Sequence, residues 1–447
     1  MKLYPHARLI PAVIAAATAV GVSPAPASAA DQPERRVQVA MVNFTDSSVP
    51  DPGKLESALK KSYFGATGSL TSYYNEVTGG ATTFAAAEGD GVTGPVDIDL
   101  AAAGCDTGKI NELTRKALAQ RGIAESDYDH LSLVYPAEKA GCDWLALGTV
   151  GGGTTWMPVG SDGEMSMTAL VHEFGHNFGY SHHMRLRCPE GDLGAGCEED
   201  GTSHKTPMGG GGWEAGLTSP ELLHNKWLTG DEVVEVAKSG TYDLRPLYGS
   251  GDGARARALD IPLGDDRLVV ELRHESGTLD GEIQGVHAYR VPKGDYAKSA
   301  LVDPTPDADE STGGDAAADA DALKTGAKLT DSARDVEVKV VRAGAGSARV
   351  AVSLAGVAAP DARPAKPAGS SAPRSANDAR PEGGSAELAE TGADSGTSVP
   401  AALGGGLLLA VGAAFLLKSR RRTATSSGRP SSGRPSSGRR SSGRRSR

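Results

Sequence analysis

Alternating and periodic runs of apolar residues divide the chain into expected strands and helices. Residues 36–44, RVQVAMVNF, alternate and are rich in β-branched side chains, which predicts a strand. HLSLVYP at residues 130–136 predicts another strand, whereas residues 53–77 carry apolar side chains at helical spacing. The glycine-rich stretch at residues 148–160, GTVGGGTTWMPVG, predicts a loop or an edge strand, and residues 165–179, MSMTALVHEFGHNFG, predict a buried helix.

From about Gly240 the pattern changes to short alternating runs separated by turn residues. Several strands at this spacing predict a small β-sandwich. An Asp- and Ala-rich stretch at residues 303–321 interrupts the series, and we interpret it as a solvated insertion because it lacks the ligand spacing of an EF-type calcium loop. The runs are TYDLRPL, ARALDIPL, RLVVELR, GVHAYRV, VEVKVVR and ARVAVSL. Helices and strands together predict an α+β fold.

The N-terminus predicts export. Lys2 and Arg8 precede the apolar stretch LIPAVIAAATAVGV, and small residues follow at Ala27–Ala29. A charged region, an apolar region and a small-residue site in this order are typical of a secretory signal peptide. We therefore interpret residues 1–30 as a signal peptide that is cleaved near its end.

The C-terminal part reads as a stalk, a membrane span and a cytoplasmic tail. Residues 357–387 are rich in Pro, Ala, Ser and Gly, which is typical of a flexible stalk. Residues 399–417 carry no charge and are nearly long enough to cross a hydrocarbon core of about 30 Å as a helix. The basic run at residues 418–422 and the low-complexity tail at residues 423–447 place that end in the cytoplasm.

The charge is divided in the same way as the predicted topology. The whole chain carries a net charge of −10, and residues 418–447 contain 11 Lys or Arg and no acid, so residues 1–417 carry −21. An acidic body with a purely basic tail does not favour nucleic-acid binding. It favours a membrane between the two charges, with the tail near anionic lipid.

The four cysteines all lie in the part that is expected to be exported. An even number of cysteines in an oxidising compartment predicts two disulfides. Four cysteines allow three pairings, of which we expect the sequence-local one, Cys105–Cys142 and Cys188–Cys197. The CxxC spacing of a zinc knuckle is absent.

The stretch HEFGHNFGYSHH, residues 172–183, carries the chemistry. His172 and His176 are four residues apart, so on a helix they share one face and can bind one Zn²⁺ ion. Glu173 is turned by about 100° from His172 and can reach a water on the metal without binding the metal itself. In this arrangement the zinc lowers the pKa of the water, and the carboxylate takes its proton as a general base.

Gly179 ends the helix because a residue without Cβ can turn the chain with a positive φ. The chain then returns towards the metal, where the three-residue step from Gly179 selects His182 as the third ligand. His183 remains an alternative if the turn differs by one residue. The full pattern H-E-x-x-H-x-x-G-x-x-H resembles the metzincin signature.

That resemblance implies a Met-turn, a turn whose methionine lies beneath the metal. Met208 in KTPMGGGGW is the methionine in a suitable position after the third histidine. Several further segments are similar to the gametolysin family of metzincins over roughly residues 36–230: RVQVAMVNF, SYYNEVTGGATTF, the Cys188–Cys197 loop, PMG and LLHNKWLTG. The resemblance implies a zinc endopeptidase for extracellular or cell-wall protein, with Glu173 as base and His172, His176 and His182 as ligands.

The segment LAETG at residues 388–392, with the apolar span and basic run after it, resembles a sortase sorting signal of the Leu-Ala-x-Thr-Gly kind. This resemblance implies cleavage between Thr391 and Gly392 by a sortase and attachment of Thr391 to the cell envelope. A single-pass membrane protein with an accidental LAETG is the alternative.

Together these features predict six segments: a signal peptide (1–30), a metzincin-like catalytic domain (31–238), a β-sandwich-like domain (239–356), a stalk (357–387), a sorting signal with its transmembrane segment (388–422) and a basic tail (423–447). The expected function is a cell-surface zinc metalloendopeptidase with a peptide or protein substrate. The alternatives are a surface adhesin on a metzincin fold with little turnover and a cell-wall amidase with the same zinc chemistry. Retention of Glu173 argues against the adhesin.

Overall fold

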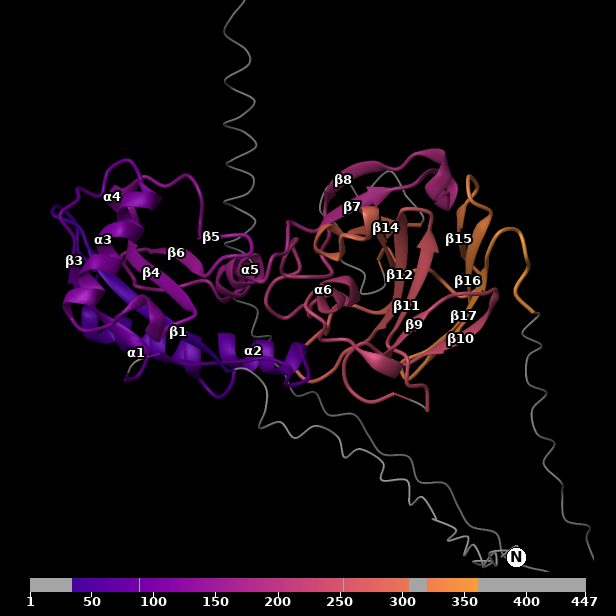
Figure 1. Cartoon of the computed structure of the whole chain (residues 1–447), viewed down its shortest axis with the longest axis horizontal. Coiled ribbons are helices and arrows are strands. Elements are labelled where there is room, and N and C mark those ends of the chain that lie inside the picture. The colour runs from indigo at the N-terminus through magenta and orange to yellow at the C-terminus, as the bar shows by residue number, and fades with distance from the viewer. Residues whose placement is uncertain (1–33, 88, 252, 305–319, 361–447) are drawn as a thin grey trace, which may run out of the picture. The chain divides into compact units, whose positions relative to one another are not determined.

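The computed structural model describes residues 34–360 with gaps at 88, 252 and 305–319. The expected signal peptide, most of the stalk, the LAETG segment with Thr391 and Gly392, the apolar span and the basic tail lie outside the described residues. The described residues form a mixed α/β protein with three sheets and few helices (Figure 1). None of the described helices combines the length and apolarity needed to cross a bilayer.

The N-terminal part is built on a six-stranded sheet with the order β2-β1-β4-β6-β5, in which β3 also pairs with β1. The pairs of β1 and β4 are parallel, whereas the short edge strand β5 runs antiparallel to β6. Every residue of β4 is buried, which fits its place inside the sheet and its continuous apolar sequence. The strands are β1 (Glu34–Asn43), β2 (Thr83–Ala86), β3 (Val92–Asp97), β4 (His130–Pro136), β5 (Leu147–Gly148) and β6 (Thr154–Val159).

Helices cover both faces of this sheet. Val37, Val39 and Met41 of β1 belong to a core shared with α1, α2 and α5, whereas Ala40 and Val42 belong to a second core shared with α3. In Figure 1, α1 and α2 accordingly lie below the sheet, and α3 and α4 lie above it. The helices of the whole described part are α1 (Pro52–Phe64), α2 (Leu70–Val77), α3 (Thr107–Gln120), α4 (Ala137–Ala140), α5 (Met167–Asn177) and α6 (Ser219–His224).

The helix expected over residues 53–77 is two helices, α1 and α2. The chain leaves the helical path at Gly65, which has an extended backbone, and restarts at Ser69. The Ser69 hydroxyl accepts a hydrogen bond from the Ser72 backbone N–H at 3.0 Å, and the Ser72 hydroxyl accepts one from the Ser69 N–H at 2.9 Å. This capping box makes Ser69 a helix start in the middle of the apolar pattern.

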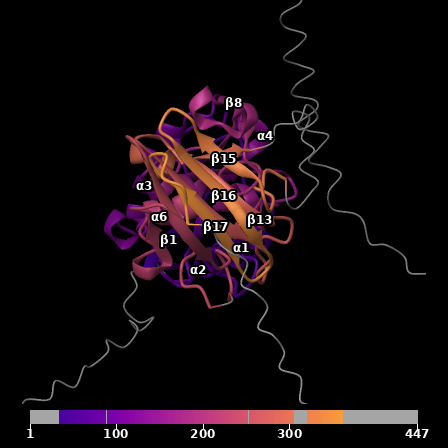
Figure 2. The ribbon, with the colours of Figure 1, turned by 90° about the vertical axis from the view of Figure 1, so that its right-hand side faces the viewer.

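The C-terminal part contains a seven-stranded and a four-stranded sheet. Their orders are β8-β7-β14-β13-β12-β11-β9 and β10-β17-β16-β15, and Figure 2 shows β15, β16 and β17 side by side. Apolar side chains of both sheets form one shared core. The strands are β7 (Met184–Arg187), β8 (Glu198–Thr202), β9 (Val233–Glu235), β10 (Gly240–Leu244), β11 (Ala258–Leu263), β12 (Asp266–Arg273), β13 (Gly285–Val291), β14 (Ala300–Asp303), β15 (Lys328–Asp331), β16 (Val336–Ala343) and β17 (Ala348–Ser353).

The seven-stranded sheet takes strands from both sides of residue 238, where the sequence suggested a boundary between domains. Strand β7 pairs in parallel with β14, and β9 pairs in parallel with β11. Residues 184–202 therefore belong to the same sheet as residues 258–303. All described residues belong to one compact unit.

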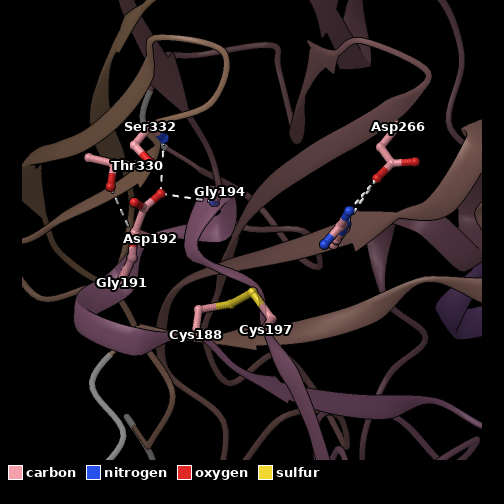
Figure 3. Close-up of a disulfide and its surroundings, with 9 residues drawn as sticks. Cys188, Gly191, Asp192, Gly194, Cys197, Asp266, Thr330 and Ser332 are labelled. Atoms are coloured by element: carbon pink, nitrogen blue, oxygen red, sulfur yellow. Dashed lines mark hydrogen bonds and ion pairs between the residues drawn. A yellow bond between two sulfur atoms is a disulfide. The ribbon is translucent and has the colours of Figure 1, made fainter.

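Two disulfides join Cys105 to Cys142 and Cys188 to Cys197, which is the sequence-local pairing. The second closes the loop between β7 and β8. Within this loop, Asp192 Oδ1 accepts hydrogen bonds from the backbone N–H groups of Gly194 and Ser332, both at 2.9 Å (Figure 3). The disulfide loop is thereby attached to the residues that follow β15. Two disulfides indicate an extracellular or otherwise oxidising environment.

Candidate metal centre

The helix α5 carries the motif and is fixed at both ends. At its start the Ser166 hydroxyl accepts a hydrogen bond from the Ala169 backbone N–H at 3.2 Å. At its end Gly179 has a φ of +100° and donates its N–H to the His176 carbonyl at 2.8 Å. The sequence predicted this stop at Gly179, and the positive φ supplies the turn that reverses the chain.

The turn after α5 brings three histidines together. The ring centroids of His172 and His176 are 4.8 Å apart. The ring centroid of His182 lies 5.2 Å from that of His172 and 5.0 Å from that of His176. One nitrogen from each ring lies within 4.8 Å of the other two, a spacing that can hold one metal ion. Two donors therefore come from the helix and one from the turn that follows it.

The backbone fixes which nitrogen of the helical histidines faces the cluster. His172 Nδ1 donates to the Pro207 carbonyl at 2.6 Å, and His176 Nδ1 donates to the Tyr180 carbonyl at 2.7 Å. A carbonyl oxygen can only accept, so the proton lies on Nδ1 in both rings. The lone pair is then on Nε2, which is the tautomer that a metal ligand needs.

Burial keeps these imidazoles neutral. It lowers the pKa of His172 to about 4, against the raising effect of the hydrogen bond to Pro207, and the neighbouring histidines lower it further. Burial also lowers the pKa of His176. Neutral imidazoles with convergent lone pairs suit a divalent ion, and an all-nitrogen donor set is typical of zinc and other late first-row metals. The residues present therefore fit a zinc ion.

Glu173 is buried beside the cluster with only 6% of its surface exposed. Burial raises the pKa of its carboxyl group to about 7, although a hydrogen bond from the Gly148 backbone N–H opposes the shift. A Cβ atom on Gly148 would lie 2.4 Å from the Glu173 carbonyl oxygen and 3.1 Å from Oε2. Only glycine fits at position 148. The sequence has a glycine-rich stretch here, but it did not show which glycine contacts Glu173.

Met208 lies directly against the motif helix. Its side chain is fully buried, and a Cβ atom on Gly175 would lie 2.2 Å from its sulfur. The neighbouring Pro207 supplies the carbonyl that orients His172. The structure thus places Met208 against the motif helix at Gly175. The sequence analysis did not predict the role of Gly175, because the sequence around a glycine inside a helix does not show which side chain packs against it.

His183 points away from the cluster. It is 2% exposed, and its Nε2 lies 3.2 Å from the Ser299 hydroxyl oxygen. Its ring packs edge-on against Tyr289 at 5.4 Å between centroids. Of the two adjacent histidines, His182 therefore joins the possible metal cluster and His183 packs against the seven-stranded sheet.

Comparison with known proteins adds little to this geometry. No family model and no curated protein matches the chain. Among solved structures, the chain is similar to wild-type OgpA from Akkermansia muciniphila, with a TM-score of 0.30 and 13% identity over 54% of this chain and 72% of that chain. A similarity this weak carries no weight for fold or function.

Proposed function

We propose that this protein is an exported zinc metalloendopeptidase of the metzincin type. The observation that carries the proposal is the convergence of three histidines, two of them in the tautomer of a metal ligand, beside one buried carboxyl group. The gametolysin-like segments in the sequence support the same assignment. His172, His176 and His182 would hold the ion.

When bound, Zn²⁺ supplies polarisation of the scissile carbonyl and activation of a water molecule for attack. Glu173 takes the proton of the attacking water and returns it to the leaving amine. The Gly148 N–H holds the carboxylate in place while it does so.

An edge strand near Glu173 supports a peptide as the substrate. In the described residues, the edge strand β5 pairs with β6 on one side only. Leu145 and Val150, which flank this strand, expose 66% and 64% of their surface. An extended peptide can add to such an edge through its backbone and place apolar side chains against this rim.

We also propose that the protein acts at the cell surface. The two disulfides indicate an oxidising environment, and the sequence carries a signal peptide, the LAETG segment and an apolar span. Cleavage by a sortase between Thr391 and Gly392 would leave the catalytic part on the envelope. Mass spectrometry of the mature C-terminus tests this assignment, and a chain that retains Gly392 would contradict it.

The decisive experiment combines metal analysis with peptide hydrolysis. The wild-type chain should contain one zinc per molecule and cleave members of a peptide library. Glu173→Gln should keep the metal and lose at least about 100-fold in kcat, because it removes the general base. The matched variant His172→Ala should lose the metal itself. Zinc binding without any peptide cleavage would instead favour the adhesin, and the absence of zinc would overturn the assignment.

A further inference from the structure

Arg273, at the end of β12, is a buried guanidinium whose partners are two buried carboxylates. Its exposed fraction is 1%, and those of Glu271 and Asp280 are 0% and 1%. Arg273 Nε donates to Asp280 Oδ2 at 2.6 Å, Nη2 donates to Asp280 Oδ1, and Nη1 donates to Glu271 Oε1 at 3.0 Å. Fully paired charges at such depth are held in one geometry, because no water can replace a lost partner.

The same three side chains bind the backbone of one loop. Arg273 donates to the Lys205 carbonyl at 3.1 Å and to the Gly216 carbonyl at 3.2 Å. Asp280 accepts from the Gly216 N–H at 2.9 Å, and Glu271 accepts from the Ser219 N–H at 2.6 Å. Four backbone groups between residues 205 and 219 are thus fastened to β12 and to Asp280.

This loop contains the groups that orient the first histidine of the cluster. Pro207 supplies the carbonyl that receives the His172 Nδ1 proton at 2.6 Å, and Met208 fills the space left by Gly175. The Lys205 carbonyl that Arg273 holds lies only two residues before Pro207. A shift of the loop would therefore turn the His172 ring or release its proton from Pro207.

We infer that Arg273 is a positioning residue for the metal site, which it serves by fixing the Lys205–Ser219 loop against the seven-stranded sheet. The inference rests on the proposed function, since it concerns the same three histidines. By this inference, the C-terminal sheets help to position the histidines of the motif, although the motif lies far upstream in the sequence. Among the described residues, the hydrogen-bond partners of the Arg273 side chain are Asp280, Glu271, Lys205 and Gly216, so it acts on the three histidines through the loop.

The test compares Arg273→Lys with Arg257→Lys in the full-length chain. Lysine keeps the charge but cannot reach two backbone carbonyls and two carboxylates with a planar fork. Arg257 is a matched control in the same part of the protein, because it donates to the Leu247 carbonyl at 2.6 Å and to Glu232 at 3.0 Å, and neither partner belongs to the Lys205–Ser219 loop. Zn²⁺ affinity is measured by competition with a chelator, and the visible spectrum of Co²⁺ added in place of zinc reports ligand geometry.

We expect Arg273→Lys to weaken Zn²⁺ binding by about 10-fold or more and to change the Co²⁺ spectrum. Arg257→Lys should lower thermal stability without changing either metal readout. A folded Arg273→Lys protein with wild-type affinity and spectrum would overturn the inference. If that variant does not fold, Asp280→Asn takes its place under the same criteria. A wild-type chain that binds no metal would instead overturn the proposed function, so the two failures are distinguishable.

Discussion

At the scale of single residues, the candidate site depends on protons that backbone carbonyls hold in place. Pro207 and Tyr180 receive the Nδ1 protons of His172 and His176, so each ring presents Nε2 to the cluster without rearrangement. The third histidine comes from the turn after Gly179, and its neighbour His183 is turned into the protein. The two adjacent histidines should therefore respond differently to the same substitution.

We expect His182→Ala to weaken Zn²⁺ binding by more than about 100-fold, because losing a metal ligand should lower the affinity more than losing a residue that only hydrogen-bonds to a ligand. His183→Ala should keep zinc within about 10-fold of wild type but lower the free energy of unfolding by about 1–3 kcal/mol, because it empties a buried position. The backbone bonds of His183 to Met208 and Ser203, both 2.9 Å long, do not depend on its side chain. Chelator titration and urea unfolding of both variants measure these effects. Loss of zinc from His183→Ala alone would contradict the assignment.

The close contact between Gly175 and Met208 gives a second prediction at this scale. Alanine favours a helix over glycine by up to about 1 kcal/mol, but its Cβ at position 175 would lie 2.2 Å from the buried sulfur. We expect Gly175→Ala to destabilise the protein by about 1–3 kcal/mol through overpacking. Gly53→Ala in α1 is the control, because a Cβ there meets nothing within 4 Å and should be neutral or stabilising. Thermal unfolding of both variants decides, and a Gly175→Ala protein as stable as wild type would refute the expectation.

At the scale of elements, the short helix α6 supports the loop of Met208 through one buried carboxyl group. Glu221 accepts hydrogen bonds from the Thr206 hydroxyl and from the N–H and hydroxyl of Thr218. The Thr206 hydroxyl also accepts from the Met208 N–H at 3.3 Å. Burial raises the pKa of Glu221 to about 7 despite these donors. The stability that Glu221 gives to α6 and the Met208 loop therefore depends on pH.

The raised pKa of Glu221 sets the sign of a pH effect. Between its ordinary pKa of 4.5 and about 7, the folded protein keeps the proton and the unfolded chain releases it. The contribution of Glu221 to the free energy of unfolding should therefore be greatest below pH 4.5 and fall by up to about 1.4 kcal/mol per pH unit until about pH 7. Glu221→Gln removes this titration, so the stability of wild type relative to the variant should fall across the same window. Urea unfolding of wild type and variant at several pH values measures the difference in stability. A difference that is constant with pH would contradict the predicted contribution of Glu221.

Sequence patterns predicted those elements whose burial is continuous or regular, and missed those that depend on a partner. The strand predicted at residues 130–136 is β4 with the same bounds, because all its residues are buried. Strand β8, EEDGT, has no apolar residue at all and exists through its pairing with β7. Likewise the three histidines could be read from their spacing, whereas the carbonyl of Pro207 and the N–H of Gly148 could not. Every residue type offers the same backbone carbonyl, so only the tertiary structure shows which backbone groups lie next to the site.

At the scale of the whole molecule, the C-terminal sheets hold the motif region from two sides. The Ser181 N–H donates to the Ala297 carbonyl at 3.1 Å, and Ser299 lies against His183, so residues after β13 contact the turn that carries His182. On the other side, β12 fastens the loop of Met208 through Arg273. The candidate site is therefore supported by residues far beyond the motif.

This dependence predicts that a chain ending at residue 238 will not form the site. Without β14, strand β7 loses its parallel partner and exposes an unpaired edge, and the contacts from Ala297 and Arg273 are lost as well. We expect residues 34–238 alone to show no cooperative thermal transition and no tight zinc binding. The matched control is a chain of residues 34–360, which keeps every described strand and should unfold cooperatively and bind one zinc. Calorimetry and metal analysis of the two proteins test this, and a cooperative transition with stoichiometric zinc in the shorter chain would show that the N-terminal half folds and assembles the site by itself.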